Sequence, residues 1–286
     1  MSGEPPFRSA AVLGTGLIGG SFALALRSAF PSLTVAGWDR PEVLQQAVQR
    51  GAISHASPGL PDALSGAELI YLALPIGATL DLLPELARLV PAGALVTDAA
   101  STKSAVCRAA GELFREGAQF LGGHPLAGRE TSGIEHADPA LFRGAKYALV
   151  GDSAAPASAR FETLLRALGA EPVWLDADTH DWAVGIVSHL PQLAAVALAG
   201  VVNDETDETG LPLSLAGSGL RDALRLAGSP YALWRDVCLT NRENVARSLD
   251  RMMQALEHLR ASLTSRELEA QFETANRVYK SLRELD

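Results

Sequence analysis

The chain contains 286 residues, of which 48% are hydrophobic and 20% are charged, so it can form one large domain or two of ordinary size. Its formal net charge of −9 argues against a nucleic-acid partner, because proteins that bind nucleic acids usually carry a basic surface. The two cysteines, Cys107 and Cys238, show no CxxC spacing, which predicts a reducing, cytoplasmic location without a disulfide framework.

The sequence shows no targeting or membrane segment. The residues before Arg8 lack a charged stretch followed by an apolar one, so no signal peptide is expected. The longest weakly polar stretch, Leu190–Val202, is too short to cross a bilayer and predicts a buried helix. No membrane partner is therefore expected.

The first part of the chain alternates short apolar runs with amphipathic segments, which is typical of βαβ units in a parallel sheet. Strands are expected at residues 10–13, 34–37, 69–74, 95–97, 119–121, 147–150 and 172–175. Helices are expected between them, at residues 21–29, 41–50, 78–89, 103–116 and 157–168.

The pattern changes after Asp176, where strand-like runs disappear. Helices are expected from there on, at residues 179–203, 213–226, 231–239, 241–263 and 266–285. The predicted fold is α/β, with an N-terminal Rossmann-type parallel-sheet domain over residues 1–176 and an all-helical domain over residues 177–286.

A G-x-G-x-x-G motif follows the first predicted strand and opens the first predicted helix. In this motif Gly14 permits a tight turn, Gly16 lets the backbone approach a pyrophosphate, and Gly19 allows close packing of helix on strand. With Leu17 and Ile18 between them, these glycines are the expected dinucleotide contacts, at a helix N-terminus that favours phosphate. A purely structural tight turn is the alternative.

The expected cofactor is NAD. Asp39 stands 20 residues after Gly19 (39 − 19), at the end of the second predicted strand, where a carboxylate bonds the adenosine ribose hydroxyls. The same carboxylate would repel the 2′-phosphate of NADP. Arg40 is able to pair with that phosphate, so NADP stays the less favoured alternative.

Two more residues follow predicted strands, and in open α/β sheets the carboxyl ends of the strands line the ligand crevice. Pro75 ends the third long apolar run and is expected near the cofactor, unless it only stops the strand. Ser101 follows the next strand, where it either contacts cofactor or substrate or caps the helix that begins near Lys103.

His124 lies between two glycines and a proline, just past the predicted strand at residues 119–121. A lone histidine is by default a buried structural one. The flanking residues favour a shaped turn that faces a ligand, where an imidazole with a pKa near 6.5 accepts a proton from a substrate hydroxyl as hydride leaves the same carbon.

The helical part contains two polar groups of interest. His189 interrupts an apolar helix just before Pro191, and it either makes a structural hydrogen bond or contacts substrate. Arg221 and Arg225 stand four residues apart with Asp222 between them, which suits carboxylate binding or a surface ion-pair cluster. The histidines show no metal-ligand spacing, so no metal is expected.

With these motifs assembled, the chain resembles the prephenate dehydrogenase family, which includes arogenate and cyclohexadienyl dehydrogenases. The resemblance covers nearly the whole chain. It rests on residues 14–21 (GTGLIGGS), 122–128 (GGHPLAG) with 131–133 (TSG), 187–191 (VSHLP), 234–236 (WRD) and 241–242 (NR).

The resemblance implies NAD-dependent oxidative decarboxylation of prephenate to 4-hydroxyphenylpyruvate in tyrosine biosynthesis, by a homodimer formed through the helical domain. It implies that His124 accepts the ring-hydroxyl proton and that Ser101 supports it beside the nicotinamide. The substrate-binding residues that it implies are His189, Arg225 for a carboxylate, Glu130 and Asp222 beside that arginine, and Trp234 as an aromatic that closes the site.

Two departures from the family pattern bear on substrate choice. The family's Asp-Thr-Thr-Arg is here Asp222-Ala223-Leu224-Arg225, and Arg129 stands where the family often has a small polar residue. The sequence does not separate prephenate from arogenate, so an arogenate or dual-specificity enzyme is the alternative.

Two rival functions are disfavoured. The first is a β-hydroxyacid dehydrogenase, a family that uses a catalytic lysine in the helical domain. The lysines here are Lys103, Lys146 and Lys280, and none of them lies in the first helices after Asp176. A dinucleotide-sensing regulator without turnover would not need both His124 and a carboxylate-binding arginine.

Overall fold

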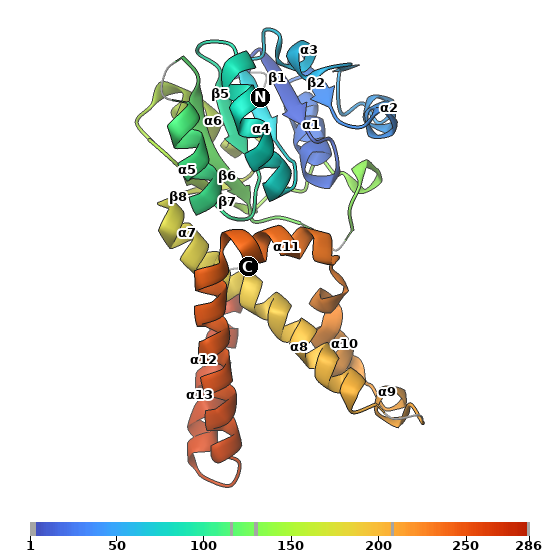
Figure 1. Ribbon diagram of the computed structural model, residues 1–286, viewed down its shortest axis with the longest axis vertical. Helices are drawn as coiled ribbons and strands as arrows, with labels where there is room; N and C mark the ends of the chain where they lie inside the picture. Colours follow the sequence, from blue (N-terminus) through green and yellow to red (C-terminus); the bar gives the residue numbers. More distant parts are fainter. Residues whose placement is uncertain (1–3, 115–116, 129–130, 207–208, 285–286) are drawn as a thin grey trace.

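The computed structural model describes residues 4–114, 117–128, 131–206 and 209–284 (Figure 1). Its N-terminal part contains one sheet of eight strands in the order β3-β2-β1-β4-β5-β6-β7-β8. The strands are β1 Ser9–Leu13, β2 Thr34–Trp38, β3 His55–Ala56, β4 Leu69–Leu72, β5 Leu95–Asp98, β6 Gln119–Pro125, β7 Lys146–Val150 and β8 Glu171–Trp174. Every predicted strand is present, and only the two-residue β3 was not expected.

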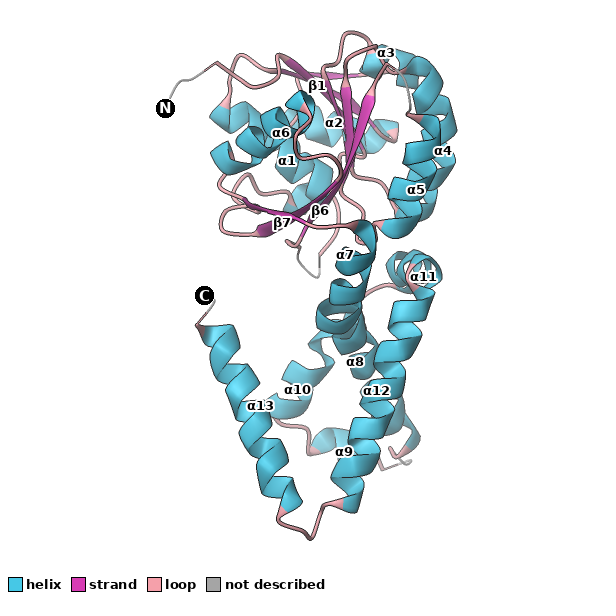
Figure 2. Cartoon of the chain, turned by 90° about the vertical axis from the view of Figure 1, so that its left-hand side faces the viewer, coloured by secondary structure: helices cyan, strands magenta, loops and turns pink. Residues whose placement is uncertain are grey.

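Helices cover both faces of the sheet (Figure 2). An apolar core on one face contains Phe22, Tyr71 and Phe161, and the core on the other contains Leu72, Leu83 and Val96. This double burial explains why the central strands are continuous apolar runs. The helices are α1 Leu17–Ala29, α2 Pro41–Gln49, α3 Leu60–Leu64, α4 Ile76–Leu89, α5 Ser104–Leu113 and α6 Pro156–Ala167.

The sheet departs from the expected parallel arrangement at one pair of strands. β6 and β7 are antiparallel, whereas the other pairs are parallel. The reason is the connection between them, residues 126–145, whose described part contains the short 3₁₀ helix η1 Ile134–His136 and no α-helix. Parallel neighbours are usually joined by a crossover through an α-helix.

The segment that contains His124 also differs from the prediction. β6 does not end at Leu121 but continues to Pro125, so His124 lies within the strand and not just past it. The cause is pairing with β7, which places His124 opposite Ala148. Strand geometry, rather than a free turn, therefore fixes the direction of this side chain.

After β8 the chain is helical in its described part, and these helices extend away from the sheet (Figure 1). They are α7 Ala177–Val184, the π-helical turn η2 Gly185–His189, α8 Leu190–Asp204, α9 Leu211–Ser214, α10 Ser218–Leu224, the 3₁₀ turn η3 Arg225–Gly228, α11 Tyr231–Thr240, α12 Arg242–Ala261 and α13 Glu267–Arg283.

The single helix expected at residues 213–226 is instead three short elements, α9, α10 and η3. Gly217, Gly219 and Gly228 lower the helix propensity of this segment, and the residues of α9 and α10 are not buried. Arg225 therefore begins a 3₁₀ turn and does not continue the helix of Arg221.

The segment Leu190–Val202 is helical as predicted but is not a buried helix in the single chain, where only Gln192 and Ala195 of α8 are buried. The run Ala177–Asp204 comprises 28 residues with a mean hydropathy of 1.7, so by length and composition it is able to cross a membrane. One such helix is weak support for a membrane span, because core helices of soluble proteins meet the same criteria. The same run carries buried polar residues, His180, Asp181 and His189.

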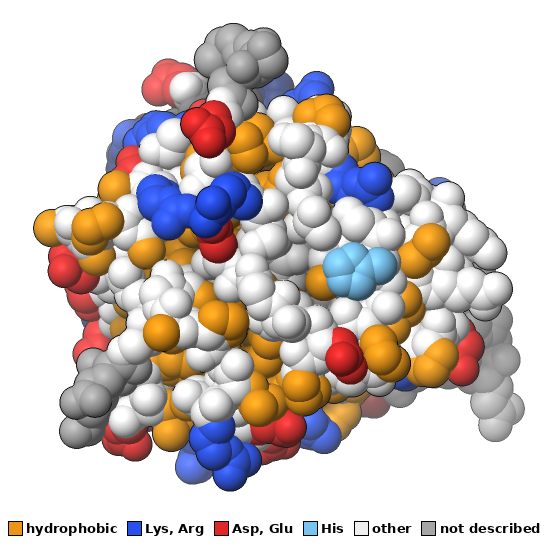
Figure 3. Space-filling view, turned by 90° about the horizontal axis from the view of Figure 1, so that it is seen from above, with side chains coloured by type: hydrophobic (Ala, Val, Ile, Leu, Met, Phe, Trp, Pro, Cys, Tyr) orange, Lys and Arg blue, Asp and Glu red, His pale blue; other side chains and the backbone are white. Residues whose placement is uncertain are grey.

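Large apolar side chains are exposed along the helical part of the single chain, including Leu215, Leu239, Leu263, Phe272 and Leu282. All of these except Leu215 lie on or beside the helices α11, α12 and α13. The outer end of the sheet domain, in contrast, shows basic, acidic and apolar side chains interspersed (Figure 3). Exposed apolar area of this extent on helices marks a surface that packs against another protein.

Candidate active site

The turn between β1 and α1 has the shape that a dinucleotide needs. Gly14 has φ +89°, and a Cβ atom there would stand 2.4 Å from the carbonyl oxygen of Ala73. A Cβ on Gly19 would stand 1.8 Å from the Gly14 carbonyl oxygen, so helix and strand touch there. Beside Gly16, by contrast, space is open, and Leu17 and Ile18 begin α1 half-buried. A pyrophosphate fits at this open position, on the N-terminus of α1.

Asp39 lies directly after β2 and reaches this turn. Its Oδ2 atom accepts a hydrogen bond of 2.7 Å from the backbone N–H of Thr15, and its Oδ1 atom accepts one of 2.7 Å from the N–H of Arg40. The carboxylate is thus fixed beside the glycine turn. The Arg40 side chain is exposed, with its Nε atom 4.0 Å from the same carboxylate.

Pro75 is the N-cap of α4, at the carboxyl end of β4. A carboxylate from the helical part completes this helix start, because Asp236 on α11 accepts a hydrogen bond of 2.9 Å from the N–H of Gly77. The side chain of Arg235 in turn donates to Asp236 at 2.9 Å. These hydrogen bonds attach the helical part to the edge of the sheet where the parallel strands have their carboxyl ends.

Ser101 lies half-buried in the turn between β5 and α5. The alternative that it caps α5 is wrong, since the helix begins at Ser104 and its free N–H groups are taken by another residue. Asp181 on α7 accepts from the N–H of Lys103 at 2.7 Å and from the N–H of Ser104 at 2.9 Å. The Ser101 hydroxyl is thus not used for capping.

His124 is the first member of a buried hydrogen-bonded chain. Its Nδ1 atom lies 2.9 Å from Nε2 of His180, and Nδ1 of His180 lies 2.8 Å from Oδ1 of Asp181. His180 and Asp181 are each 1% exposed, and His124 is 9% exposed. The chain therefore leads from the interior of the domain junction outward to His124.

The chemistry of this hydrogen-bonded chain determines which ring nitrogens carry protons. An ionised carboxylate only accepts, so His180 carries its proton on Nδ1 and offers the Nε2 lone pair to His124. His124 then donates from Nδ1, which leaves its Nε2 lone pair as the acceptor. A histidine held in this tautomer is a base at Nε2.

The pKa of His124 is well below its ordinary value. Burial is the main cause, and the charges of His180, Lys103 and His189 lower it further. Burial raises the pKa of Asp181, but hydrogen bonds from His180, Lys103 and Ser104 outweigh it and bring that pKa below its ordinary value. His124 is thus neutral and Asp181 ionised near pH 7.

His189 lies close to this chain, at the end of the π-helical turn η2 that precedes Pro191. Single π-helical turns within α-helices are frequent at functional sites. Its Nδ1 atom lies 3.2 Å from Nδ2 of Asn241, which itself donates to the Asp181 carbonyl oxygen at 2.7 Å. His189 therefore has a structural partner on one side of its ring.

Trp234 packs edge-on against His189, with ring centroids 5.8 Å apart. In the described part of the chain its Nε1 atom is buried without a hydrogen-bond partner. Buried donors without partners are costly, which suits a donor that a ligand oxygen satisfies.

Arg225 and Asp222 are exposed on α10 and η3. The side chain of Gln192, one turn after His189, donates to the carbonyl oxygen of Leu226 at 2.8 Å, so η3 lies beside the start of α8. Glu130, like Arg129, lies outside the described residues. Among the described residues, no group of three or more His, Cys, Asp or Glu side chains is placed to hold a metal ion.

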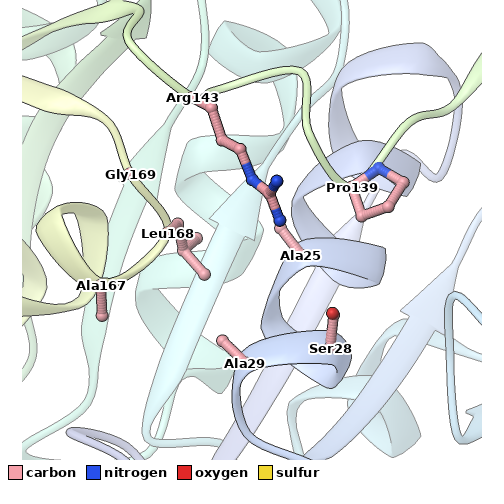
Figure 4. A pocket seen from close by; sticks show the side chains of 8 residues that line it. All are labelled: Ala25, Ser28, Ala29, Pro139, Arg143, Ala167, Leu168 and Gly169. Atoms are coloured by element: carbon pink, nitrogen blue, oxygen red, sulfur yellow. The ribbon is translucent and has the colours of Figure 1, made fainter. Parts of the chain in front are cut away.

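The sequence reasoning did not identify four buried residues of this region: Asp98, Lys103, His180 and Asp181. His180 and Asp181 were interpreted as part of a stretch that caps a helix, and His180 as a histidine without metal-ligand spacing, although the adjacent pair at the start of a helix was a usable signal. A surface pocket at the opposite end of α1 is unrelated to the site, since it is lined by Ala25, Ser28, Ala29, Pro139, Arg143, Ala167, Leu168 and Gly169 (Figure 4).

A glycine turn fit for a pyrophosphate and a neutral buried histidine at the same edge of the sheet define a class, the dehydrogenases that use a dinucleotide. Comparison with known proteins narrows this class. The nucleotide-binding domain of prephenate dehydrogenases matches residues 22–172, and their dimerization domain matches residues 176–277. The chain belongs to the prephenate dehydrogenase family.

Individual relatives agree. Prephenate dehydrogenase of Lactococcus lactis subsp. cremoris is 36% identical over 261 residues, which cover 91% of this chain and 72% of the relative. The crystal structure of prephenate dehydrogenase from Aquifex aeolicus with hydroxyphenyl propionate and NAD⁺ has a TM-score of 0.87 at 28% identity and covers 98% of both chains. Arogenate dehydrogenase of Synechocystis has a TM-score of 0.77 at 31% identity, covering 96% of this chain and 97% of that one.

The depressed pKa of His189 predicts a loss of stability in acid. Burial is the main cause that lowers this pKa to about 4, so between about pH 6.5 and pH 4 the unfolded chain binds a proton that the folded chain does not. The free energy of unfolding is expected to fall by about 3 kcal/mol across that window through this residue. Urea unfolding at pH 7 and pH 4.5 measures it.

The matched comparison is His189→Gln against His258→Gln, since His258 is exposed on α12. The first substitution is expected to reduce the acid dependence by the part that His189 contributes, because the buried His124 remains, and the second to leave it unchanged. An equal acid dependence in wild type and His189→Gln would contradict the prediction.

Proposed function

We propose that the chain catalyses the NAD-dependent oxidative decarboxylation of prephenate to 4-hydroxyphenylpyruvate. The observation that carries this proposal is the hydrogen-bonded chain from Asp181 through His180 to a neutral His124, at the same edge of the sheet as the dinucleotide turn, in a member of this family. Bound NAD supplies the hydride acceptor. The hydride leaves the ring carbon that bears the hydroxyl, the C–CO₂ bond breaks, and its electron pair aromatises the ring.

His124 acts on the ring hydroxyl in this proposal. Its Nε2 lone pair accepts the hydroxyl hydrogen bond and takes up the proton as the ring carbon is oxidised, and the phenol regains that proton when the ring becomes aromatic. The reaction therefore needs no net proton. Ser101, in the neighbouring turn after β5, supports the same hydroxyl beside the nicotinamide.

The cofactor is assigned to the β1–α1 turn. Gly14, Gly16 and Gly19 with Leu17 and Ile18 hold the pyrophosphate, Asp39 binds the adenosine ribose, and Pro75 borders the nicotinamide side. The fixed carboxylate of Asp39 beside the turn favours NAD over NADP, because a 2′-phosphate would meet a negative charge there.

The substrate site is assigned to the junction with the helices. His189 and Trp234 border it, and the Trp234 N–H, which has no partner among the described residues, donates to a substrate oxygen in this proposal. Arg225 binds a carboxylate, with Asp222 and Glu130 as its acidic partners. A guanidinium suits this role because it binds a carboxylate through two parallel hydrogen bonds.

We further propose that the boundary at Asp176 separates a dinucleotide-binding domain from a substrate-binding and dimerisation domain. The apolar side chains exposed along α11 to α13 support a homodimer, and the match of this region to a dimerization domain agrees with it. The absence of a CxxC pair and the biosynthetic reaction support a cytoplasmic enzyme.

Arogenate is the second candidate substrate, because the Synechocystis structure that resembles this chain is an arogenate dehydrogenase. Prephenate and arogenate differ only in the side chain, a keto group against an amine. The altered residues Ala223 and Leu224 lie in the segment that would read this difference.

The experiment that tests the function is the absorbance at 340 nm of purified protein with NAD and either prephenate or arogenate. A rise with prephenate is expected, and the ratio of kcat/KM values for the two substrates assigns specificity. No rise with either substrate, with NAD or NADP, would contradict the proposal.

The substitution His124→Asn is expected to lower kcat by about 10²–10⁴-fold, which is the contribution of a general base. NAD affinity is expected to stay within about twofold, because the glycine turn is untouched. The control is His136→Asn, which alters an exposed histidine of η1. An unchanged kcat in His124→Asn would remove His124 from the mechanism.

A further inference from the structure

Strand β6 continues beyond the end of its neighbour. β5 ends at Asp98, and its pairing with β6 ends at Thr97 opposite Leu121. On its other edge β6 stays paired with β7 as far as Pro125. The backbone around Gly123 therefore needs hydrogen-bond partners that no strand provides on the β5 side.

Two buried side chains supply those partners. Oδ1 of Asp98 accepts a hydrogen bond of 3.0 Å from the N–H of Gly123, and Nζ of Lys103 donates one of 2.7 Å to the Gly123 carbonyl oxygen. Lys103 and Asp98 also form an ion pair with each other, and both side chains are 0% exposed. The carboxylate and the ammonium thus replace a missing stretch of strand.

The fit at this point is tight. A Cβ on Gly123 would stand 2.4 Å from the carbonyl oxygen of Asp98, and a Cβ on Gly122 would stand 2.6 Å from Sγ of Cys107. Only glycines let β6 pass this close to the turn after β5. The ion pair therefore holds the residue next to His124 at its closest approach to that turn.

Lys103 also meets the other end of the histidine chain. Its backbone N–H donates to Oδ1 of Asp181, the same oxygen that lies 2.8 Å from His180. One residue thus contacts the strand that carries His124 and the carboxylate that orients His180. Because its side chain is fully buried, it acts through these contacts and not on substrate.

We propose that the buried Asp98–Lys103 pair is a positioning device for the reaction, which holds β6 so that Nε2 of His124 faces the substrate hydroxyl. The inference rests on the proposed function of His124. It makes Asp98 and Lys103 positioning residues, whose loss displaces the base without removing it. A displacement of about 1 Å at a reacting group can cost 10²-fold in rate.

The charges around His124 allow a second readout. The titratable groups facing it are His180 and Asp181 on α7, His189 in η2, and the Asp98–Lys103 pair. Lys103 contributes to the lowered pKa of His124. Removing the ammonium alone would leave the Asp98 carboxylate and raise that pKa.

The main test is the double variant Asp98→Asn/Lys103→Met, which removes both charges together and leaves an acceptor for the Gly123 N–H. We expect kcat with prephenate to fall about 100-fold, with NAD affinity within about twofold of wild type. The control is Lys146→Met/Glu171→Gln, which removes an exposed Lys–Glu pair that joins β7 to β8. Its kcat is expected to equal that of wild type.

The second measurement does not depend on turnover. In Lys103→Met, NMR titration of the His124 imidazole is expected to show its pKa raised toward the ordinary value, because one of the charges that lower it is removed. This separates a failure of the positioning role from a failure of the proposed function, since the titration is observed in the resting protein.

Three results would overturn the proposal: a folded double variant with kcat within threefold of wild type, an unchanged His124 titration in Lys103→Met, or failure of both variants to fold. The last result would make the pair a general folding element.

Discussion

The carboxylate of Asp181 accepts hydrogen bonds from the backbone of Lys103 and Ser104 and from the ring of His180. Its partners belong to both parts of the chain, because Lys103 and Ser104 start a helix of the sheet domain while His180 belongs to the first long helix after it. One buried negative charge thus joins the two parts and sets the tautomer of a histidine. The rest of the site depends on this contact.

The attachment of the two parts follows one principle. The N-termini of α4 and α5 carry free N–H groups at the carboxyl edge of the sheet, and each receives a carboxylate from the helical part, Asp236 and Asp181 respectively. The hydroxyl pair Thr102 and Thr240, 2.7 Å apart, lies at the same junction. The crevice where cofactor and substrate are expected to meet is therefore bordered by contacts that fix both parts.

Local patterns predicted much of this molecule. The apolar runs predicted every strand but the two-residue β3, and glycine spacing predicted the β1–α1 turn, because backbone sterics act within a few residues. The antiparallel direction of β7 was not predicted. The lack of a predicted helix between β6 and β7 was a usable signal for it, because parallel neighbours are usually joined through a helix. A single helix was predicted where α9, α10 and η3 lie, because the apolar periodicity of the segment was given more weight than the low helix propensity of its glycines.

The candidate site was only partly predictable for a different reason. His124 was found from its glycine and proline neighbours, but His180 and Asp181 lie 56 and 57 residues further along the chain (180 − 124 and 181 − 124) and meet it only after folding. Asp98 and Lys103 likewise acquire their role from the length of β6 relative to β5, which pairing with β7 determines. Residues that act through tertiary hydrogen bonds leave no periodic pattern in a sequence.

The central claim is that the Asp181–His180 chain holds His124 neutral, with its proton on Nδ1 and its lone pair on Nε2. The most direct test is ¹⁵N NMR of the histidine rings at pH 7 in the resting protein. The account predicts that Nδ1 of His124 is protonated and Nε2 is not. A proton on Nε2, or a doubly protonated ring, would contradict it.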